Sequence, residues 1–427
     1  MSLVAWNVSG LYQKLGIDEC RDFICSCDVI GVSETWVRNI PPDIQGMDLV
    51  AFRKAKKITA NKGRASGGIC VYSKCTDQFS VKEIITKDDN DVIWIEISTE
   101  VGEINVCFSY NPPVSSAYKN AAFFDCLEKQ IFEHWPDDSK FLIIMGDLNA
   151  RTGNQEDFYA GKDYNDCSSV DLPLRRNRDP EMNYFGKKLI RFCKTTGVRI
   201  INGRVNGDLE GELTFVSHTG KSLLDYGLAS EHSFNIVNKF QVLSRIESDH
   251  LPIKLTLSCG KVNPNAELPL NEKSIAINKF SLKVEKLEEV SSEIDNNHDQ
   301  LIEMSKQNSD ETFSYKKFSD FLCDRLKAFK IKNKKMSARK QSTCLSECYK
   351  RRAKNALRLF KMCNSEKNLK AYLTLKTKFK IAFAEEKTHR HNEISSQIDD
   401  LYSTKNWSSL WKKIRRYSGK KLSLIHI

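Results

Sequence analysis

Short runs of apolar and β-branched residues recur through the first 260 residues of the chain, each bounded by polar or turn-forming positions. Runs of this kind predict β-strands. The predicted strands cover residues 3–8, 28–32, 68–72, 92–97, 104–109, 141–145, 198–201, 213–216, 223–228, 236–242 and 253–257. A few helical patterns separate them, notably at 117–134 and at 184–196, where Asn183 can cap the helix. Many strands with few helices favour two packed, mostly antiparallel sheets with helices outside, an α/β sandwich.

The pattern changes after residue 260. The last proline is Pro269, and Gly419 is the only glycine after Gly260. Apolar residues spaced three and four apart predict two amphipathic helices, at 345–363 and 369–383. We therefore predict three parts: a sandwich domain at 1–258, a polar linker at 259–310 and a basic, mostly helical extension at 311–427.

Length and composition agree with this division. A chain of 427 residues exceeds what one compact core normally holds. No apolar run reaches 18 residues and no secretory signal is present at the N-terminus, so we expect no membrane span and an intracellular protein, in the nucleus or, alternatively, the cytoplasm. The 14 cysteines are scattered without paired spacing, so we expect no disulfides.

The net charge of +11 is unevenly distributed. Residues 1–260 hold 30 basic and 35 acidic residues, a net of −5, whereas residues 261–427 hold 36 and 20, a net of +16. An excess of this size favours a polyanion partner, although a basic helix can also be only a solvated face. The basic run at 332–340 is also a candidate for nuclear import.

Polar residues suited to metal binding or proton transfer follow several predicted strands. They are Asn7, Glu34, Asp147, Asn149, Asp225, Asp249 and His250. Strand ends are the usual place for a site built on a rigid scaffold. Oxygen ligands of this kind suit Mg²⁺, and one histidine oriented by an aspartate suits the attack of water on a phosphodiester. Taken singly, each residue has a structural alternative: a turn, a strand-end cap or a packed histidine.

The same residues also form an ordered set of motifs. Asn7, Glu34, Tyr110, Gly146-Asp147-Leu148-Asn149, Asp225 and Ser248-Asp249-His250 resemble, in order and approximate spacing, the endonuclease/exonuclease/phosphatase superfamily, which includes deoxyribonuclease I and the apurinic/apyrimidinic endonucleases. Asn202-Gly203-Arg204, Gly207-Asp208, Gly211, Thr214 to Ser217 and Leu224-Asp225-Tyr226 are similar to the version in non-LTR retrotransposon proteins, where this domain precedes a reverse transcriptase. The resemblance spans residues 2–257.

The resemblance implies a deoxyribonuclease I-like, four-layer fold and a metal cofactor, Mg²⁺ with Mn²⁺ as the alternative. By resemblance, Glu34 binds the metal, and Asn7 and Asp249 support the metal site. A second candidate metal site, for zinc, would use Cys344, Cys348, His389 and His391, but no CxxC motif accompanies it.

The resemblance also implies the catalytic roles. Asp147 activates or positions the attacking water, and Asn149 orients it. His250, held by Asp225, contacts the scissile phosphate. Tyr110 contacts a phosphate oxygen, although it can also simply pack at a strand end.

Three positions depart from the pattern of abasic-site repair enzymes. Ser9, Ser222 and Pro113 stand where those enzymes carry Asp, Trp and Asn. These differences argue against abasic-site specificity and leave phosphodiester cleavage unaffected. Tyr/Phe-x-Asp-Asp, the polymerase signature, is absent, although residues 407–421 resemble the segment before a reverse transcriptase.

We therefore expect a Mg²⁺-dependent endonuclease that nicks DNA and derives from a retroelement. DNA is the expected partner, with RNA as a second candidate for the extension; the oligomeric state is not indicated by the sequence. The alternatives are an inactive remnant that binds nucleic acid or protein, and a phosphatase of the same superfamily.

Overall fold

The computed structural model describes residues 1–56, 65–85, 91–100, 102–135, 141–158, 172–258, 344–404 and 407–418. The predicted linker at 259–310, the start of the predicted extension up to residue 343 and the basic run at 332–340 lie outside these residues. The described residues before 259 and the helices after 344 belong to one compact unit.

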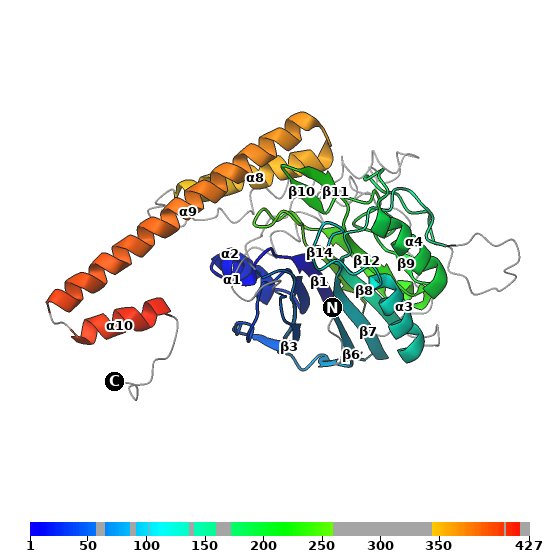
Figure 1. Ribbon diagram of the computed structural model, residues 1–427, viewed down its shortest axis with the longest axis horizontal. Helices are drawn as coiled ribbons and strands as arrows, with labels where there is room; N and C mark the ends of the chain where they lie inside the picture. The colour runs from blue at the N-terminus through cyan, green and yellow to red at the C-terminus, as the bar shows by residue number, and fades with distance from the viewer. Residues whose placement is uncertain are drawn as a thin grey trace, which may run out of the picture. The chain divides into compact units, whose positions relative to one another are not determined.

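Most strands in the described residues form two six-stranded sheets (Figure 1). The first sheet, in the order β13-β14-β1-β2-β4-β3, contains β1 (Ser2–Asn7), β2 (Val29–Ser33), β3 (Met47–Arg53), β4 (Ile69–Lys74), β13 (Val237–Val242) and β14 (Ile253–Leu257). The second, in the order β5-β6-β7-β8-β12-β9, contains β5 (Ser80–Glu83), β6 (Val92–Thr99), β7 (Gly102–Tyr110), β8 (Phe141–Asp147), β9 (Arg199–Ile200) and β12 (Asp225–Ala229). A separate hairpin joins β10 (Phe215–Ser217) to β11 (Gly220–Ser222).

Strand pairing is mostly antiparallel, as the sequence pattern predicts. Among the described strand pairs, β1–β2 and β7–β8 are parallel. The β8–β12 pair is antiparallel and places Asp225 opposite Asp147. This register brings two carboxylates to the same end of the second sheet.

The alternation of side chains along the strands builds the core. In β1, Leu3 and Ala5 belong to the cluster between the two sheets, whereas Val4 and Trp6 belong to a cluster on the outer face of the first sheet. Successive side chains of a strand point to opposite faces, so a strand buried on both faces is apolar throughout. This is why β1 and β8 are continuous apolar runs in the sequence.

Helices cover the outer face of each sheet. The helices α1 (Leu11–Leu15) and α2 (Asp18–Cys25) pack on the first sheet, and α3 (Phe123–His134) and α4 (Tyr184–Thr196) pack on the second (Figure 1). A short 3₁₀ helix, η1 (Glu231–Asn235), follows β12. The result is helix, sheet, sheet, helix, which confirms the predicted four-layer α/β sandwich.

Of the two helices predicted before residue 260, one has the predicted bounds and the other begins later than predicted. The helix at 184–196 is confirmed: Asn183 Oδ1 accepts a hydrogen bond from the Gly186 amide, and Gly197 ends the helix with a φ of 76°. The helix predicted at 117–134 begins only at Phe123, because the Asn120 side chain accepts a hydrogen bond from the Ala122 amide and holds the preceding residues in a turn.

The sequence pattern did not indicate β3 or β5. The pairing of β3 with β4 shifts register between Leu49 and Ala51, and this irregularity breaks the alternation that marks a strand. Half of the β5 residues are exposed. Both strands lie at the edges of their sheets, where burial selects fewer apolar residues.

The C-terminal region is helical, as predicted. It contains α8 (Leu345–Met362), α9 (Glu366–Ser403) and α10 (Trp407–Ser418), and α9 continues beyond the predicted end at residue 383. Ser365 caps α9 by accepting a hydrogen bond from the Asn368 amide. The Ser346 hydroxyl, at the start of α8, hydrogen-bonds to Glu386 in α9, so the two helices form an antiparallel hairpin. None of the described helices is both long enough and apolar enough to cross a bilayer.

Candidate active site

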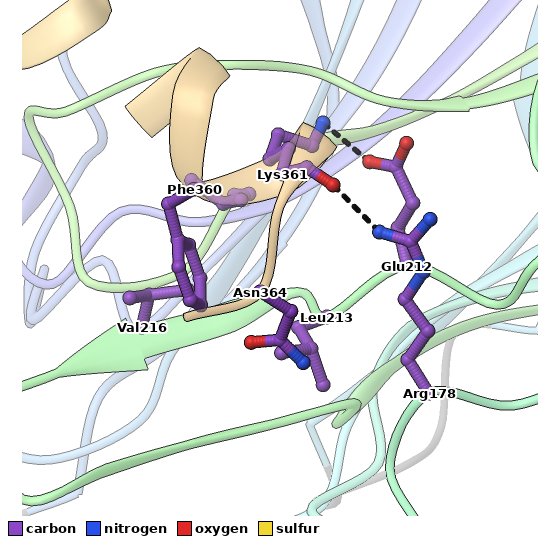
Figure 2. A pocket seen from close by; sticks show the side chains of 8 residues that line it. Arg178, Glu212, Leu213, Val216, Phe360, Lys361 and Asn364 are labelled. Atoms are coloured by element: carbon purple, nitrogen blue, oxygen red, sulfur yellow. Dashed lines mark hydrogen bonds and ion pairs between the residues drawn. The ribbon is translucent and has the colours of Figure 1, made fainter. Parts of the chain in front are cut away.

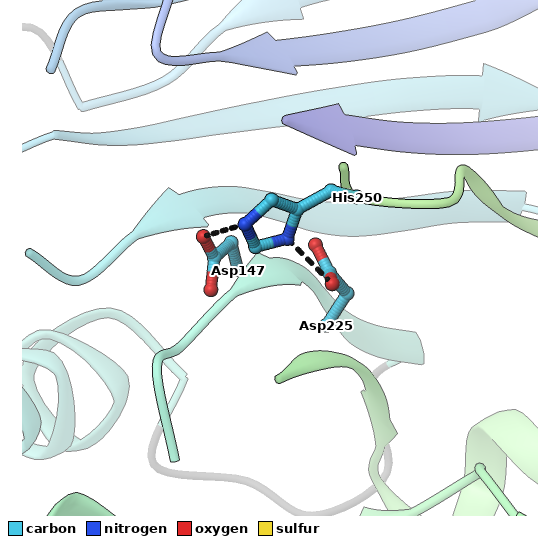
Figure 3. Close-up of side chains that lie close together, drawn as sticks. All are labelled: Asp147, Asp225 and His250. Atoms are coloured by element: carbon cyan, nitrogen blue, oxygen red, sulfur yellow. Dashed lines mark hydrogen bonds and ion pairs between the residues drawn. The ribbon is translucent and has the colours of Figure 1, made fainter. Parts of the chain in front are cut away.

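A histidine lies between two carboxylates at the centre of the site (Figure 3). His250 Nδ1 is 3.0 Å from Asp225 Oδ2, and His250 Nε2 is 3.7 Å from Asp147 Oδ2. Asp147 ends β8 and Asp225 begins β12, so the antiparallel register of these two strands sets their separation. His250 arrives from the segment before β14, where it forms a bridge with Phe215.

Burial and mutual charge set the protonation of these three groups. Asp147 is 1% exposed, Asp225 2% and His250 8%. Burial lowers the pKa of His250, but the Asp225 and Asp147 carboxylates outweigh this effect and raise the pKa to about 9. Burial, together with the charge of Asp225, raises the pKa of Asp147 to about 7, against the opposing effects of His250 and of hydrogen bonds. The two carboxylates therefore favour the protonated form of the imidazole, and burial favours the protonated form of Asp147 more than is usual for an aspartate.

Asp147 is fixed by hydrogen bonds to both of its oxygens. Asn7 Nδ2 donates to Oδ2 at 2.9 Å, and the Asn149 backbone amide donates to Oδ1 at 3.0 Å. The Asn149 side chain in turn donates to the Asn111 carbonyl at 2.8 Å. These contacts hold the carboxylate in one orientation beside His250.

Glu34 and Tyr110 form a second pair in the same region. The Tyr110 hydroxyl donates to Glu34 Oε1 at 2.5 Å, and Trp36 Nε1 donates to Glu34 Oε2 at 3.3 Å. Tyr110 ends β7 and pairs in register with Asp147. Burial and the nearby Glu34 carboxylate raise the pKa of Tyr110, so its hydroxyl stays protonated and remains a donor.

Backbone strain concentrates at this site. Among the described residues, the non-glycine residues with positive φ are Ser9, Glu34, Trp36 and Asn149, with φ values between 48° and 58°. All four lie on the loops that follow β1, β2 and β8. Such conformations are uncommon for non-glycine residues and persist where the surrounding structure imposes them, often at functional sites.

Asp249, unlike the other predicted site residues, contacts the C-terminal helix α9. Its Oδ1 is 2.9 Å from Lys376 Nζ and 3.4 Å from Lys380 Nζ, both in α9. Among the described residues, the group of acidic and histidine side chains close enough together to hold a metal ion consists of Asp147, Asp225 and His250, without Asp249. The structure thus joins Asn7, Asp147 and Asn149 to the Asp225–His250 pair, and it places Glu34 with Tyr110 and Asp249 with α9.

The donor set fits a hard cation. Carboxylate and amide oxygens predominate, and they are the ligands that Mg²⁺ prefers. In addition, the buried Asn111 Oδ1 has no hydrogen-bond partner within the described structure. The buried Asp147–Asp225–His250 group could itself hold a metal ion. The alternative zinc residues Cys344, Cys348, His389 and His391 form no such cluster in the described part of the chain.

Several supporting residues were not singled out by the chemistry of the sequence. Thr214 Oγ1 accepts a hydrogen bond from the Asp225 backbone amide at 2.9 Å, and Asn202 Nδ2 donates a hydrogen bond to the Asp225 carbonyl at 3.2 Å. Trp6 Nε1 donates to the His250 carbonyl at 3.0 Å. Thr214 and Asn202 fall inside motifs noted in the sequence, so a signal for them existed. No signal in the sequence pointed to Lys376, which pairs with Asp249, because it is one of many lysines in α9.

The model of the endonuclease/exonuclease/phosphatase family matches residues 4–250. No match to the curated proteins was found.

Three solved structures are among those similar to this chain. The endonuclease domain of TRAS1, a telomere-specific non-LTR retrotransposon, is 15% identical, covers 60% of this chain and 98% of its own, and has a TM-score of 0.41. An AP endonuclease from Archaeoglobus fulgidus is 16% identical, covers 60% and 99%, and has a TM-score of 0.40. The catalytic domain of Xenopus laevis APE2 is 15% identical, covers 62% and 94%, and has a TM-score of 0.40.

Proposed function

The chain belongs to the endonuclease/exonuclease/phosphatase family, and from this premise we propose that it is a Mg²⁺-dependent endonuclease that nicks DNA. Membership makes the chain a hydrolytic enzyme of the nuclease or phosphodiesterase type. The observation that carries the narrower proposal is the position of His250 between Asp225 and Asp147, with Asp147 held on both oxygens. A base and a cationic group fixed side by side are what hydrolysis of a phosphodiester requires.

Asp147 is proposed to position the attacking water and take up its proton. With a pKa raised to about 7, this carboxylate is a better base near neutral pH than an ordinary aspartate. Asn7 and the Asn149 amide keep it from rotating. Asn149, whose side chain is anchored on the Asn111 carbonyl, is proposed to orient the same water.

His250 is proposed to contact the scissile phosphate. Its pKa of about 9 keeps the ring protonated at neutral pH, so it can stabilise the negative charge that develops on a phosphate oxygen. Asp225 Oδ2 accepts a hydrogen bond from the Nδ1–H group of His250 and fixes the orientation of the ring. We propose that Tyr110 donates its hydroxyl proton to another phosphate oxygen when substrate is bound; in the structure without substrate the same proton is donated to Glu34.

Mg²⁺, with Mn²⁺ as an alternative, is proposed as the cofactor, held by Glu34 with support from Asn7 and Asp249. When bound, such an ion neutralises charge on the phosphate and polarises its oxygens. The strained φ of 49° at Glu34 and its bond from Tyr110 aim the carboxylate in one direction. Both lysine contacts of Asp249 are made by Oδ1.

DNA is the proposed substrate, and the basic extension supports this choice. Residues 261–427 carry a net charge of +16, which suits a polyanion. RNA is the second candidate partner for these residues. The motifs from Asn202 to Tyr226 support an origin in a retroelement, with the endonuclease preceding a reverse transcriptase.

The test is incubation of the purified full chain with supercoiled plasmid in Mg²⁺, in Mn²⁺ and in EDTA. We expect a relaxed circle with metal and none with EDTA. Release of phosphate from p-nitrophenyl phosphate without plasmid nicking would support the phosphatase alternative. Retardation of DNA on a gel without hydrolysis of either substrate would support the binding-module alternative.

A further inference from the structure

The α8–α9 hairpin packs into the same core as the sandwich. Apolar residues of both helices belong to the cluster that fills the space between the two sheets. From α8 and α9 these are Ala353, Ala356, Leu357, Phe360, Tyr372, Leu373 and Phe379. The two helices run beside the β10–β11 hairpin, where His218 contacts Thr377 and Lys221 contacts Asn364 (Figure 1). One apolar face of the α8–α9 hairpin is therefore buried against the sandwich, although both helices lie beyond the family match at 4–250.

Ion pairs and hydrogen bonds join both ends of α8 to the sandwich domain. At the end of α8, Lys361 Nζ is 2.5 Å from Glu212, and the Lys361 carbonyl accepts a hydrogen bond from Arg178 at 2.7 Å (Figure 2). At the other end, Lys350 and Lys354 pair with Glu19. Several basic residues of the hairpin are thus used to attach it to the acidic sandwich domain.

Lys376 connects this interface to the active site. Its side chain is 3% exposed, and Nζ donates to the Ser248 carbonyl at 2.8 Å and pairs with Asp249 Oδ1 at 2.9 Å. These two residues immediately precede His250. Ser248 links two residues of the site. Its hydroxyl donates a hydrogen bond to the Asn7 carbonyl at 2.8 Å and accepts one from the His250 backbone amide at 3.3 Å.

The burial of Lys376 explains why its contacts are restrictive. A buried ammonium group is costly unless it is paired and hydrogen-bonded, so the structure favours the one arrangement that satisfies it. That arrangement requires the Ser248–Asp249 segment to lie against α9. The neighbouring Lys380 reaches the same Asp249 oxygen at 3.4 Å, but its side chain is 55% exposed and imposes no such constraint.

We propose that Lys376 is a positioning residue of the active site, which holds the Ser248–Asp249 segment so that His250 meets Asp147 and Asp225 in a productive geometry. The catalytic unit of this chain then includes the α8–α9 hairpin. The proposal rests on the proposed endonuclease function for its kinetic test. It also makes a structural claim about His250 that can be measured without any activity.

The experiment compares Lys376→Met, Lys376→Arg and Lys378→Met in the full chain. Lys378 is the matched control, because it lies on the same helix and loses the same charge but is exposed and points to the Tyr349 ring. We expect Lys376→Met to lower kcat for plasmid nicking by about tenfold to a hundredfold, the scale of a small misplacement of a catalytic group, while KM changes little. Lys376→Arg should recover most of kcat, and Lys378→Met should behave as wild type.

The second measurement is the NMR signal of the His250 imidazole, assigned by its loss in His250→Ala. We expect it to shift in Lys376→Met and to stay in place in Lys378→Met. If the wild-type chain nicks no DNA but this signal shifts, the endonuclease proposal fails and the positioning role stands. An unshifted signal with wild-type kcat, or a kcat that rises in Lys376→Met, would overturn the positioning role. Lys376→Gln, which keeps a hydrogen-bond donor, replaces Lys376→Met if thermal melting shows that the latter does not fold.

Discussion

Asn7 Nδ2 donates a hydrogen bond of 2.9 Å to Asp147 Oδ2 and so joins the last residue of β1 to the last residue of β8, 140 positions later in the chain. The two strands belong to different sheets. The site is therefore built where the ends of the two sheets meet, and its geometry depends on how the sheets pack.

Replacing the central histidine should abolish most of the activity and leave the fold intact. We expect His250→Ala to lower the nicking rate by at least about a hundredfold, the scale of losing a positioned acid or an electrostatic stabiliser. His389→Ala is the control, because His389 has a side chain that is 76% exposed in α9. The rates come from plasmid relaxation and the fold from thermal melting. A folded His250→Ala protein that nicks at the wild-type rate would refute the site assignment.

Removing the hydroxyl that holds Glu34 should weaken metal binding. In Tyr110→Phe the Glu34 carboxylate loses its 2.5 Å hydrogen bond from Tyr110 and keeps the longer one, of 3.3 Å, from Trp36 Nε1, so its orientation is less restricted. We expect the Mg²⁺ concentration for half-maximal nicking to rise by about tenfold, the scale of losing an interaction that orients a metal ligand. Tyr184→Phe, at a half-exposed tyrosine outside the site, should leave it unchanged. An identical Mg²⁺ requirement in both variants would show that Tyr110 has no part in the metal site.

Abasic sites should not be strongly preferred. Ser9 and Ser222 stand where abasic-site repair enzymes carry Asp and Trp, and Ser222 is buried in β11 with its carbonyl bonded to the Thr214 amide. A duplex with one abasic site should therefore be cut no more than about tenfold faster than an undamaged duplex, a difference of roughly 1.4 kcal/mol in the barrier. Parallel time courses on the two labelled duplexes measure this ratio. A ratio near a thousand would favour a repair enzyme.

Asp208 should make stability fall with rising pH. Burial raises its pKa to about 6, and its Oδ2 has no hydrogen-bond partner among the described residues. Between about pH 4 and pH 6 the unfolded chain releases the Asp208 proton while the folded chain keeps it, so the free energy of unfolding decreases as the pH rises through this window. The contribution of a shift of about two pKa units is roughly 3 kcal/mol.

Denaturant unfolding of the wild type and Asp208→Asn across pH 4 to 8 tests this prediction. The asparagine cannot ionise, so we expect its stability relative to the wild type to improve as the pH rises and to level off above pH 7. A difference that stays constant with pH would contradict the shifted pKa. Glu210→Gln, at an exposed neighbouring carboxylate, is the control for a general effect of charge.

The exposed basic face of α8 should account for part of the salt dependence of DNA binding. Arg351, Arg352 and Arg358 are exposed, whereas Lys350 and Lys361 are engaged with the sandwich domain. If all three arginines contact phosphates, their replacement by alanine should make the log–log slope of affinity against salt shallower by up to about 2.7 on duplex DNA. Titrations of fluorescent duplex DNA and of single-stranded RNA at several salt concentrations give the slopes. Unchanged slopes would mean that this face is only solvated.

The fold and most of the candidate site were predictable from the sequence because their signals are local. Alternation and apolar runs mark the strands, and Asn183 with Gly197 marks α4, since each reports the environment of a few consecutive residues. The polar residues that follow the strands identified Asp147, Asn149, Asp225 and His250 as a group. The edge strands β3, with its irregular register, and β5, half of whose residues are exposed, gave a weaker signal and were not predicted.

Only the tertiary structure decided which of these residues touch and what else completes the site. The bond from Asn7 to Asp147 spans 140 positions, and the bond from Lys376 to Ser248 spans 128. Neither has a local signature, because a long-range contact depends on how sheets and helices pack and not on the periodicity of either segment. The sequence by itself therefore determined the strands and the chemistry at their ends. The packing of α9 against the sandwich domain decided that the buried Lys376, 126 positions after His250, contacts the Ser248–Asp249 segment that precedes this histidine.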